Sequence, residues 1–343
     1  MTRTRSKGLD IAKGIGILLV VWAHAQGPTS AVIYQFHMPL FFIISGYLFN
    51  SRNTVKEFLL RKIKSLYIPF VFWNLAVIAV RSLYNLISGT PTLAYTAKAA
   101  IKAVLTLDKD MQLGAIWFLG ALFVMSILYK LCDTYINPKK YKRLVITAIF
   151  LALALIGFAV DLPYFFSRTL ILGMFFAFGF GVQENKEKLE QYNKPAVAFV
   201  CLLMFIVIAA NNSADMGHNE YSSPVQFVIG ACCASYFVIW LSNTLANSST
   251  RFLSPIQNGF EHLGKRSIDI VIWQFAAFNI VIAVQLALAG LPLSQLFDFG
   301  HVYESGHGWW IAYVVVGVTV PLLWCDFLRM GPWGRFLKKM HAV

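Results

Sequence analysis

Residues 9–25 read LDIAKGIGILLVVWAHA, an apolar run that carries an acid, an ammonium group and an imidazole. A run of this length predicts a helix that crosses the hydrocarbon core of a membrane, which is about 30 Å thick. Comparable apolar runs recur along the whole chain of 343 residues, of which 58% are hydrophobic and only 13% are charged. Soluble domains carry about 25% charged residues, so the composition excludes a water-soluble globule.

The spacing of these runs predicts an all-α, polytopic membrane helical bundle. We expect about ten transmembrane helices in a single transmembrane domain over residues 1–343, with no separate soluble domain. The predicted spans are 9–25, 33–50, 66–84, 115–132, 144–160, 167–183, 195–211, 224–242, 267–289 and 309–328. Because this number is even, both termini are expected on the same side of the membrane.

The basic residues predict which side that is. With the N-terminus inside, all but five of the 29 Lys and Arg residues fall in inner segments, as the positive-inside rule requires. The exceptions are Arg81, Lys98, Lys102, Lys109 and Arg168. We therefore expect cytoplasmic N- and C-termini. The net charge of +13 then reflects inner loops that contact anionic membrane lipid, and no nucleic-acid partner is expected.

The first run also resembles a cleaved signal peptide, because Ala23-His24-Ala25 follows a short apolar core from Ile15 to Trp22. Two charges within the run, and the polytopic character of the rest of the chain, favour an uncleaved first span instead. The five cysteines lack the spacing of metal ligands, so neither a metal nor a disulfide framework is expected.

Ionisable side chains inside a span are costly and are therefore functional candidates. Lys13 and His24 are eleven positions apart, which places them about 20° apart around a helix and roughly 16 Å apart along it. Asp10, three residues before Lys13, lies on the same side. This polar line suggests a functional site. The alternative is an interfacial Asp10–Lys13 ion pair together with a hydrated histidine at the helix end.

A second histidine opens the next span in FHMPLFF, residues 36–42, after a short connection that contains Gly27 and Pro28. His37 and His24 are thus both expected at the outer membrane level. Arg61, Lys62 and Lys64 follow this span. Such a cluster is typical of the inner end of any span, and it also suits the phosphates of a cytosolic nucleotide-bearing donor.

Taken together, these motifs resemble the acyltransferase-3 family of integral-membrane O-acyltransferases, especially its short fucose 4-O-acetylase-like and exopolysaccharide O-acetyltransferase members. Lys13 and His24 match the family's Arg/Lys-x10-His pattern, and FHMPLFF with IISGY (43–47) matches a second motif. Arg61, WFL (117–119) and LGKRSIDI (263–270) extend the resemblance over about residues 8–328. The sequence departs from the family at Gln274, where members often have histidine, so any role of a histidine there is absent or altered.

The resemblance implies acetyl-CoA as the acyl donor and a sugar hydroxyl of a cell-surface or exported glycan as the acceptor, in a bacterial inner membrane. His24 would act as the general base, since imidazole has a suitable pKa near 6.5. His37 would orient the acceptor, share a proton or polarise the thioester. The remaining expected site residues are Asp10 and Lys13 in a channel, Arg61, Lys62 and Lys64 at the CoA phosphates, and Trp117 at the substrate.

Several alternatives remain open at this level. Direct transfer and an acyl-histidine intermediate are both compatible with the residues, as are acetyl and slightly larger acyl groups such as succinyl. A secondary transporter or exporter of a sugar or small metabolite is the competing function, although its usual related halves are not visible here. A non-catalytic subunit of a polysaccharide export complex would leave the Lys13–His24 line unexplained.

Overall fold

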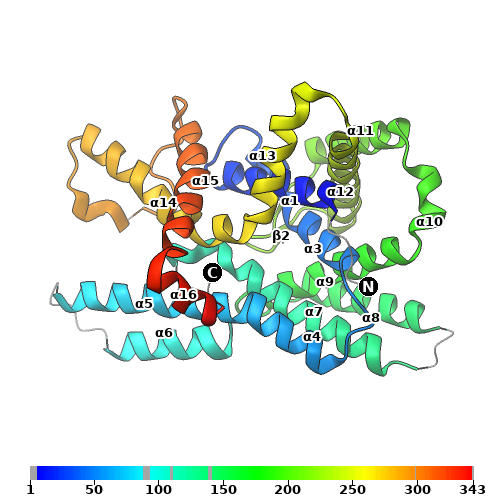
Figure 1. Cartoon of the computed structure of the whole chain (residues 1–343), viewed down its shortest axis with the longest axis horizontal. Coiled ribbons are helices and arrows are strands. Elements are labelled where there is room, and N and C mark those ends of the chain that lie inside the picture. The colour runs from blue at the N-terminus through cyan, green and yellow to red at the C-terminus, as the bar shows by residue number, and fades with distance from the viewer. Residues whose placement is uncertain (1–5, 88–92, 109–110, 138–140, 298, 342–343) are drawn as a thin grey trace. The chain divides into compact units, whose positions relative to one another are not determined.

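The computed structural model describes residues 6–87, 93–108, 111–137, 141–297 and 299–341. These residues form helices and one small antiparallel strand pair (Figure 1), which confirms the all-α prediction. The chain divides into two compact units. The first consists of residues 1–52 and 128–267, and the second of residues 53–127 and 268–343. Helix α7 (Trp117–Tyr135) contributes to both units.

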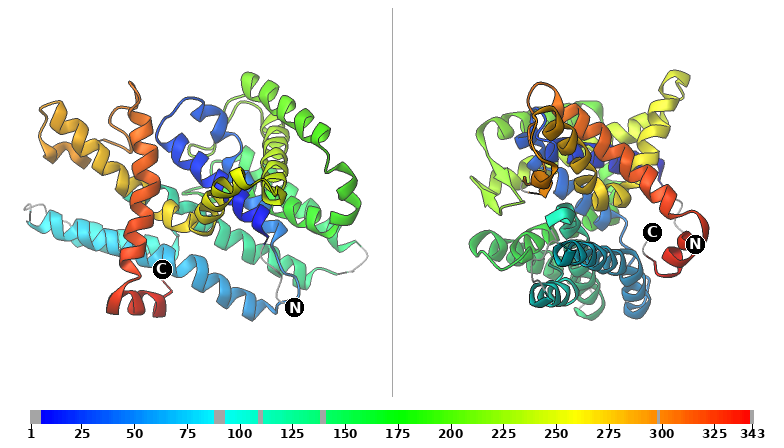
Figure 2. Two further views of the ribbon diagram at one scale, coloured as in Figure 1. Left: turned by 45° about the horizontal axis from the view of Figure 1, so that its top comes forward. Right: turned by 90° about the vertical axis from the view of Figure 1, so that its left-hand side faces the viewer.

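The first unit holds both histidine motifs. Its main elements are α1 (Lys7–His24), α2 (Ser30–Tyr34), α3 (His37–Tyr47), α8 (Lys142–Ala159), α9 (Phe166–Glu184), α10 (Lys186–Leu189), α11 (Pro195–Asn211), β1 (Ala214–Asp215), β2 (Glu220–Tyr221), α12 (Pro224–Asn247) and α13 (Ser254–Lys265). Short 3-10 turns cover Glu190–Tyr192 and Arg251–Leu253. Helix α1 packs along α13, and α3 packs along α9 (Figure 2).

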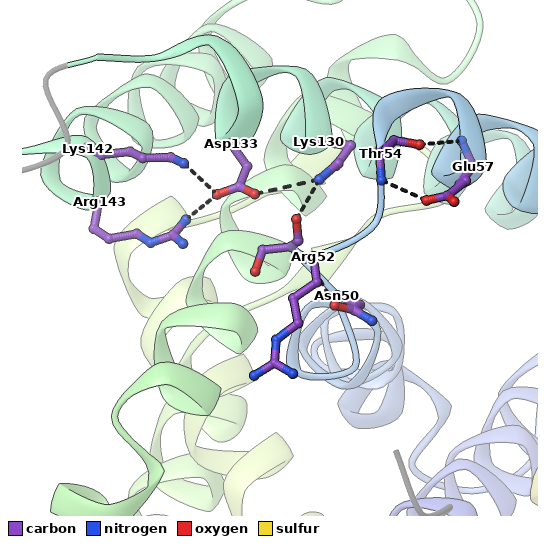
Figure 3. Close-up of polar contacts among 9 residues, drawn as sticks. Asn50, Arg52, Thr54, Glu57, Lys130, Asp133, Lys142 and Arg143 are labelled. Atoms are coloured by element: carbon purple, nitrogen blue, oxygen red, sulfur yellow. Dashed lines mark hydrogen bonds and ion pairs between the residues drawn. The ribbon is translucent and has the colours of Figure 1, made fainter. Parts of the chain in front are cut away.

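The second unit holds the basic cluster. It contains α4 (Val55–Lys62), a π-helical turn (Ile63–Tyr67), α5 (Ile68–Ile87), α6 (Leu93–Leu105), a 3-10 turn (Met111–Ile116), α14 (Ser267–Leu288), a 3-10 turn (Leu293–Phe297), α15 (Trp309–Leu328) and α16 (Gly331–Lys339). Thr54 and Glu57 form a capping box that starts α4 (Figure 3). The π-helical turn then joins α4 to α5 without a break, so that Val55–Leu83 is one continuous helical segment, part of which is apolar enough to cross a membrane.

Within the described residues, seven helices are long and apolar enough to cross a membrane, against the ten spans expected. The bent pair Lys186–Tyr192 and Pro195–Asn211 makes eight if it is counted as one span. The difference lies in the first two predicted spans. Helix α1 carries Lys7, Asp10 and Lys13, and the second predicted span is divided between α2 and the eleven-residue α3.

Glycines allow the backbones of helices α3 and α9 in the first unit to touch. A Cβ atom on Gly46 would lie 1.9 Å from the Phe176 carbonyl oxygen, and one on Gly179 would lie 2.1 Å from the Ile43 carbonyl oxygen. These two glycines therefore set the distance between α3 and α9. A Cβ atom on Gly181 would meet nothing within 4 Å, so Gly181 does not set the distance between α3 and α9.

We expect Gly179→Ala to destabilise the protein by about 1–3 kcal/mol, because the methyl group meets backbone that cannot rotate away. Gly181→Ala on the same helix is the matched control. It should be neutral or stabilising by up to about 1 kcal/mol, since alanine is the better helix former. Thermal unfolding of the two purified variants in detergent compares them directly. Equal melting temperatures for the two variants would contradict the close α3–α9 contact.

A buried carboxylate ties the C-terminal end of α7 to its neighbours (Figure 3). Asp133 is 4% exposed and pairs with Arg143 at 2.8 Å, Lys142 at 3.2 Å and Lys130 at 4.0 Å. The Lys130 ammonium also donates to the Ser51 carbonyl at 2.8 Å. Asp133 is thus the shared anion of three cations, one of which is itself buried.

Asp133→Ala should cost about 3–5 kcal/mol, because it leaves the buried Lys130 ammonium without its carboxylate partner. Glu184→Ala is the matched control, since Glu184 pairs with the same Arg143 guanidinium at 2.8 Å but its side chain is 35% exposed. Loss of an exposed pair should cost about 1 kcal/mol or less. The account of this network fails if both variants unfold at the same temperature.

Candidate functional site

The first part of the site is an ion pair on α1. The Lys13 ammonium lies 2.6 Å from the Asp10 carboxylate, which confirms that the two side chains share a face. Asp10 is 2% exposed and lies in the α1–α13 interface, where its backbone carbonyl approaches Gly264. Because Asp10 is buried and Lys13 is not, the pair presents an ammonium group at the edge of the helix interface.

The second part is a pair of histidines at the opposite end of α1. His24 is the last residue of α1 and His37 is the first residue of α3. Residues Gln26 and Thr29 adopt positive φ angles of 54° and 66°, which reverse the chain between the two helices. The ring centroids of His24 and His37 lie 6.4 Å apart and the rings meet edge to face. The structure therefore brings the two predicted histidines together.

The surroundings of His37 determine which of its nitrogens carries hydrogen. The side chain is 3% exposed, and its Nδ1 atom lies 2.9 Å from the Ile33 carbonyl oxygen. A carbonyl oxygen only accepts hydrogen bonds, so Nδ1 is the donor. In the neutral ring, Nε2 then holds the lone pair and is free to accept a proton or a hydrogen bond.

Tyr34 completes this cluster, and the sequence interpretation did not include it. Its ring centroid lies 5.5 Å from that of His37 and 6.2 Å from that of His24. Its hydroxyl donates to the Ala23 carbonyl at 3.0 Å, which joins α2 to the end of α1. The sequence pointed to Tyr34 only through its position three residues before His37. The contact between Tyr34 and His24 arises because the chain reverses direction between α1 and α3.

The other predicted site residues belong to the second unit. Arg61 and Lys64 are exposed, while Lys62 is half-buried with its ammonium 5.4 Å from the centre of the Phe58 ring. Trp117 is buried at the start of α7, and Gln274 is fully buried in α14. The roles assigned to Arg61, Lys62, Lys64 and Trp117 remain predictions. Among the described residues, no group of three or more His, Cys, Asp or Glu side chains is arranged to hold a metal ion.

Comparison with known proteins gives one family and two distant relatives. A family model for an acyltransferase domain, acyltransferase-3, matches residues 6–326. Nodulation protein NolL of Mesorhizobium japonicum is 26% identical over 262 residues, which cover 68% of this chain and 66% of the relative. Nodulation protein NolL of Sinorhizobium fredii is 31% identical over 216 residues, which cover 57% and 56%. This chain thus spans less than two thirds of either relative. No solved structure matches it.

Proposed function

The chain belongs to the acyltransferase-3 family, and from this premise we propose that it transfers an acetyl group from acetyl-CoA to a sugar hydroxyl of a cell-surface or exported glycan. The observation that carries the proposal is the contact of His24, His37 and Tyr34 in the first unit. Acyl transfer to a hydroxyl needs a base near neutral pH, and a pair of imidazoles supplies one.

In the proposed reaction, His24 removes the proton of the acceptor hydroxyl as its oxygen attacks the thioester carbonyl carbon. The new C–O bond forms, the C–S bond breaks, and His24 passes the proton it removed to the leaving CoA sulfur. The hydrogen bond from His37 Nδ1 to the Ile33 carbonyl fixes the orientation of the imidazole ring. The lone pair on Nε2 can then orient the acceptor or share the proton. Tyr34 keeps both rings at the end of α1.

An acyl-histidine intermediate is the alternative order of steps, in which the histidine takes the acetyl group before the acceptor arrives. Rapid quenching of the enzyme with labelled acetyl-CoA, before acceptor is added, separates the two routes. Label on the protein favours the intermediate, while CoA release that depends on acceptor with no labelled protein favours direct transfer.

We also propose the arrangement of the donor. Arg61, Lys62 and Lys64 hold the CoA phosphates on the cytoplasmic side, and the exposure of Arg61 and Lys64 supports this role. Lys13, paired with Asp10, lines the donor path along α1. The proposal counts the two histidine segments, residues 9–25 and 33–50, as spans in addition to the eight candidates, which gives ten spans with both termini inside. It also includes a bacterial inner membrane and Trp117 at the substrate.

The ester content of the cell-surface glycan tests this function in cells. Acetate released by mild alkali is measured in cells that express the protein and in cells that lack it, together with CoA release by membranes from both. We expect both signals only with the protein. A change in sugar export with no change in ester content or CoA release would favour a transporter and contradict the proposal.

A further inference from the structure

A short hairpin of the first unit lies against the helix that carries Tyr34. Strands β1 and β2 pair with Ala214 opposite Tyr221 and Asp215 opposite Glu220, and β1 contacts α2. The buried Gln35 amide donates to the Asn212 carbonyl at 2.9 Å, which fixes the base of the hairpin beside α2. The residues of this hairpin are therefore neighbours of the histidine cluster.

Charged groups of both signs meet at the hairpin turn. The Arg168 guanidinium, from α9, donates to the Gly217 carbonyl at 2.7 Å. The Asp215 carboxylate accepts from the Gly217 N–H at 2.6 Å and lies 2.9 Å from the His218 ring nitrogen. The turn therefore brings a guanidinium, a carboxylate and an imidazole together, so that neither positive nor negative charge dominates it.

Two buried polar atoms of the hairpin have no hydrogen-bond partner among the described residues, namely Asn219 Oδ1 and the Tyr221 hydroxyl. The Tyr221 ring packs between Phe158 and Phe227, with centroids 5.0 Å and 4.9 Å away. Burial raises the pKa of Tyr221 far above its ordinary value, so its hydroxyl keeps its proton. Buried polar atoms are nearly always paired, and an unpaired one requires an explanation.

We propose that Asn219 and Tyr221 form the recognition site for the acceptor sugar, next to the histidine cluster. The inference rests on the proposed function and adds the residues that select the acceptor. A sugar presents adjacent hydroxyls that donate and accept, which match an amide oxygen and a phenol. The two unpaired atoms are shielded from solvent, so the hairpin shifts to admit the sugar. The strand ladder of the hairpin has only two residue pairs, so the shift breaks few ladder hydrogen bonds.

Binding of simple sugars to the full-length protein in detergent tests the site without requiring turnover. The probes are the methyl glycosides of glucose, galactose, fucose and rhamnose, observed by saturation-transfer NMR. The variants are Tyr221→Phe and Asn219→Gly, since glycine tolerates the positive φ of 59° at position 219. Tyr192→Phe, which removes an exposed hydroxyl elsewhere in the first unit, is the matched control.

We expect wild type to bind at least one probe, and both hairpin variants to raise its Kd about three- to tenfold, as loss of one hydrogen bond does. Tyr221→Phe should also keep or raise the melting temperature, because it removes an unpaired buried hydroxyl. The control should change neither value. A lower melting temperature of Tyr221→Phe would mean that the hydroxyl is structural, and that result would overturn the proposal.

The same experiment separates this inference from the proposed function. Unchanged Kd values in both hairpin variants, or no binding of any probe by wild type, would overturn the sugar site even if CoA release depends on acceptor. Sugar binding that weakens in both variants, from a protein that never releases CoA, would instead contradict the acyltransferase proposal and support the hairpin site.

Discussion

His24→Ala should reduce acceptor-dependent CoA release about 10²- to 10⁴-fold, the usual contribution of a general base. His24 is half-buried at the end of α1, so its removal takes away the base while the α1–α13 contact stays in place. Glycan ester content should fall in parallel at equal membrane expression. A purified variant with the elution profile and melting temperature of wild type would confirm that the loss is chemical.

His262→Ala is the matched control for this prediction. His262 is an exposed histidine on α13, in the same unit, and it has no place in the proposed site. Its substitution should leave the rate within about twofold of wild type. If His24→Ala instead keeps a rate close to that of His262→Ala, His24 is not the base, and His37 becomes the residue to test next.

Gly264→Val should prevent stable folding of the first unit. A Cβ atom on Gly264 would lie 1.8 Å from the Asp10 carbonyl oxygen and 2.9 Å from the Gly14 nitrogen. Gly14 makes a reciprocal contact, since its Cβ atom would lie 1.9 Å from the Phe260 carbonyl oxygen. Because these neighbours are backbone atoms, valine must push α1 away from α13. We expect a cost of about 3 kcal/mol or more.

Gly259→Val on the same helix is the control, because a Cβ atom there meets nothing within 4 Å. It should cost no more than about 1 kcal/mol, since valine is no worse than glycine in a helix. Size-exclusion chromatography and thermal unfolding in detergent report the difference. Monodisperse Gly264→Val protein with the melting temperature of Gly259→Val would show that α1 and α13 are not in backbone contact.

Local spacing was enough to predict several parts of the site. The three-residue separation of Asp10 and Lys13 predicted their shared face, which the ion pair confirms. The short connection between the histidine motifs predicted that His24 and His37 lie at the same membrane level, and the structure places their ring centroids 6.4 Å apart. Both inferences depend only on helix geometry and chain length, so they needed no knowledge of the tertiary fold.

Other features depend on contacts between distant segments and were not predictable from spacing. The hairpin reaches α2 through Gln35 and Asn212, which are far apart in the chain. Asp133 gathers its cations from two helices, and Tyr34 reaches His24 only after the chain reverses. Among the described residues, seven or eight helices are long and apolar enough to be spans, because the second predicted span is divided before His37, a break that hydropathy alone did not detect.

The central claim is that this protein itself moves an acetyl group from acetyl-CoA to a sugar hydroxyl. Purified wild-type protein in proteoliposomes, supplied with acetyl-labelled acetyl-CoA and a glycan acceptor, tests it most directly. The account predicts alkali-labile label on the glycan together with an equal amount of free CoA, and neither product with His24→Ala. Label that never reaches the glycan across a panel of acceptors, or equal transfer by His24→Ala, would contradict it.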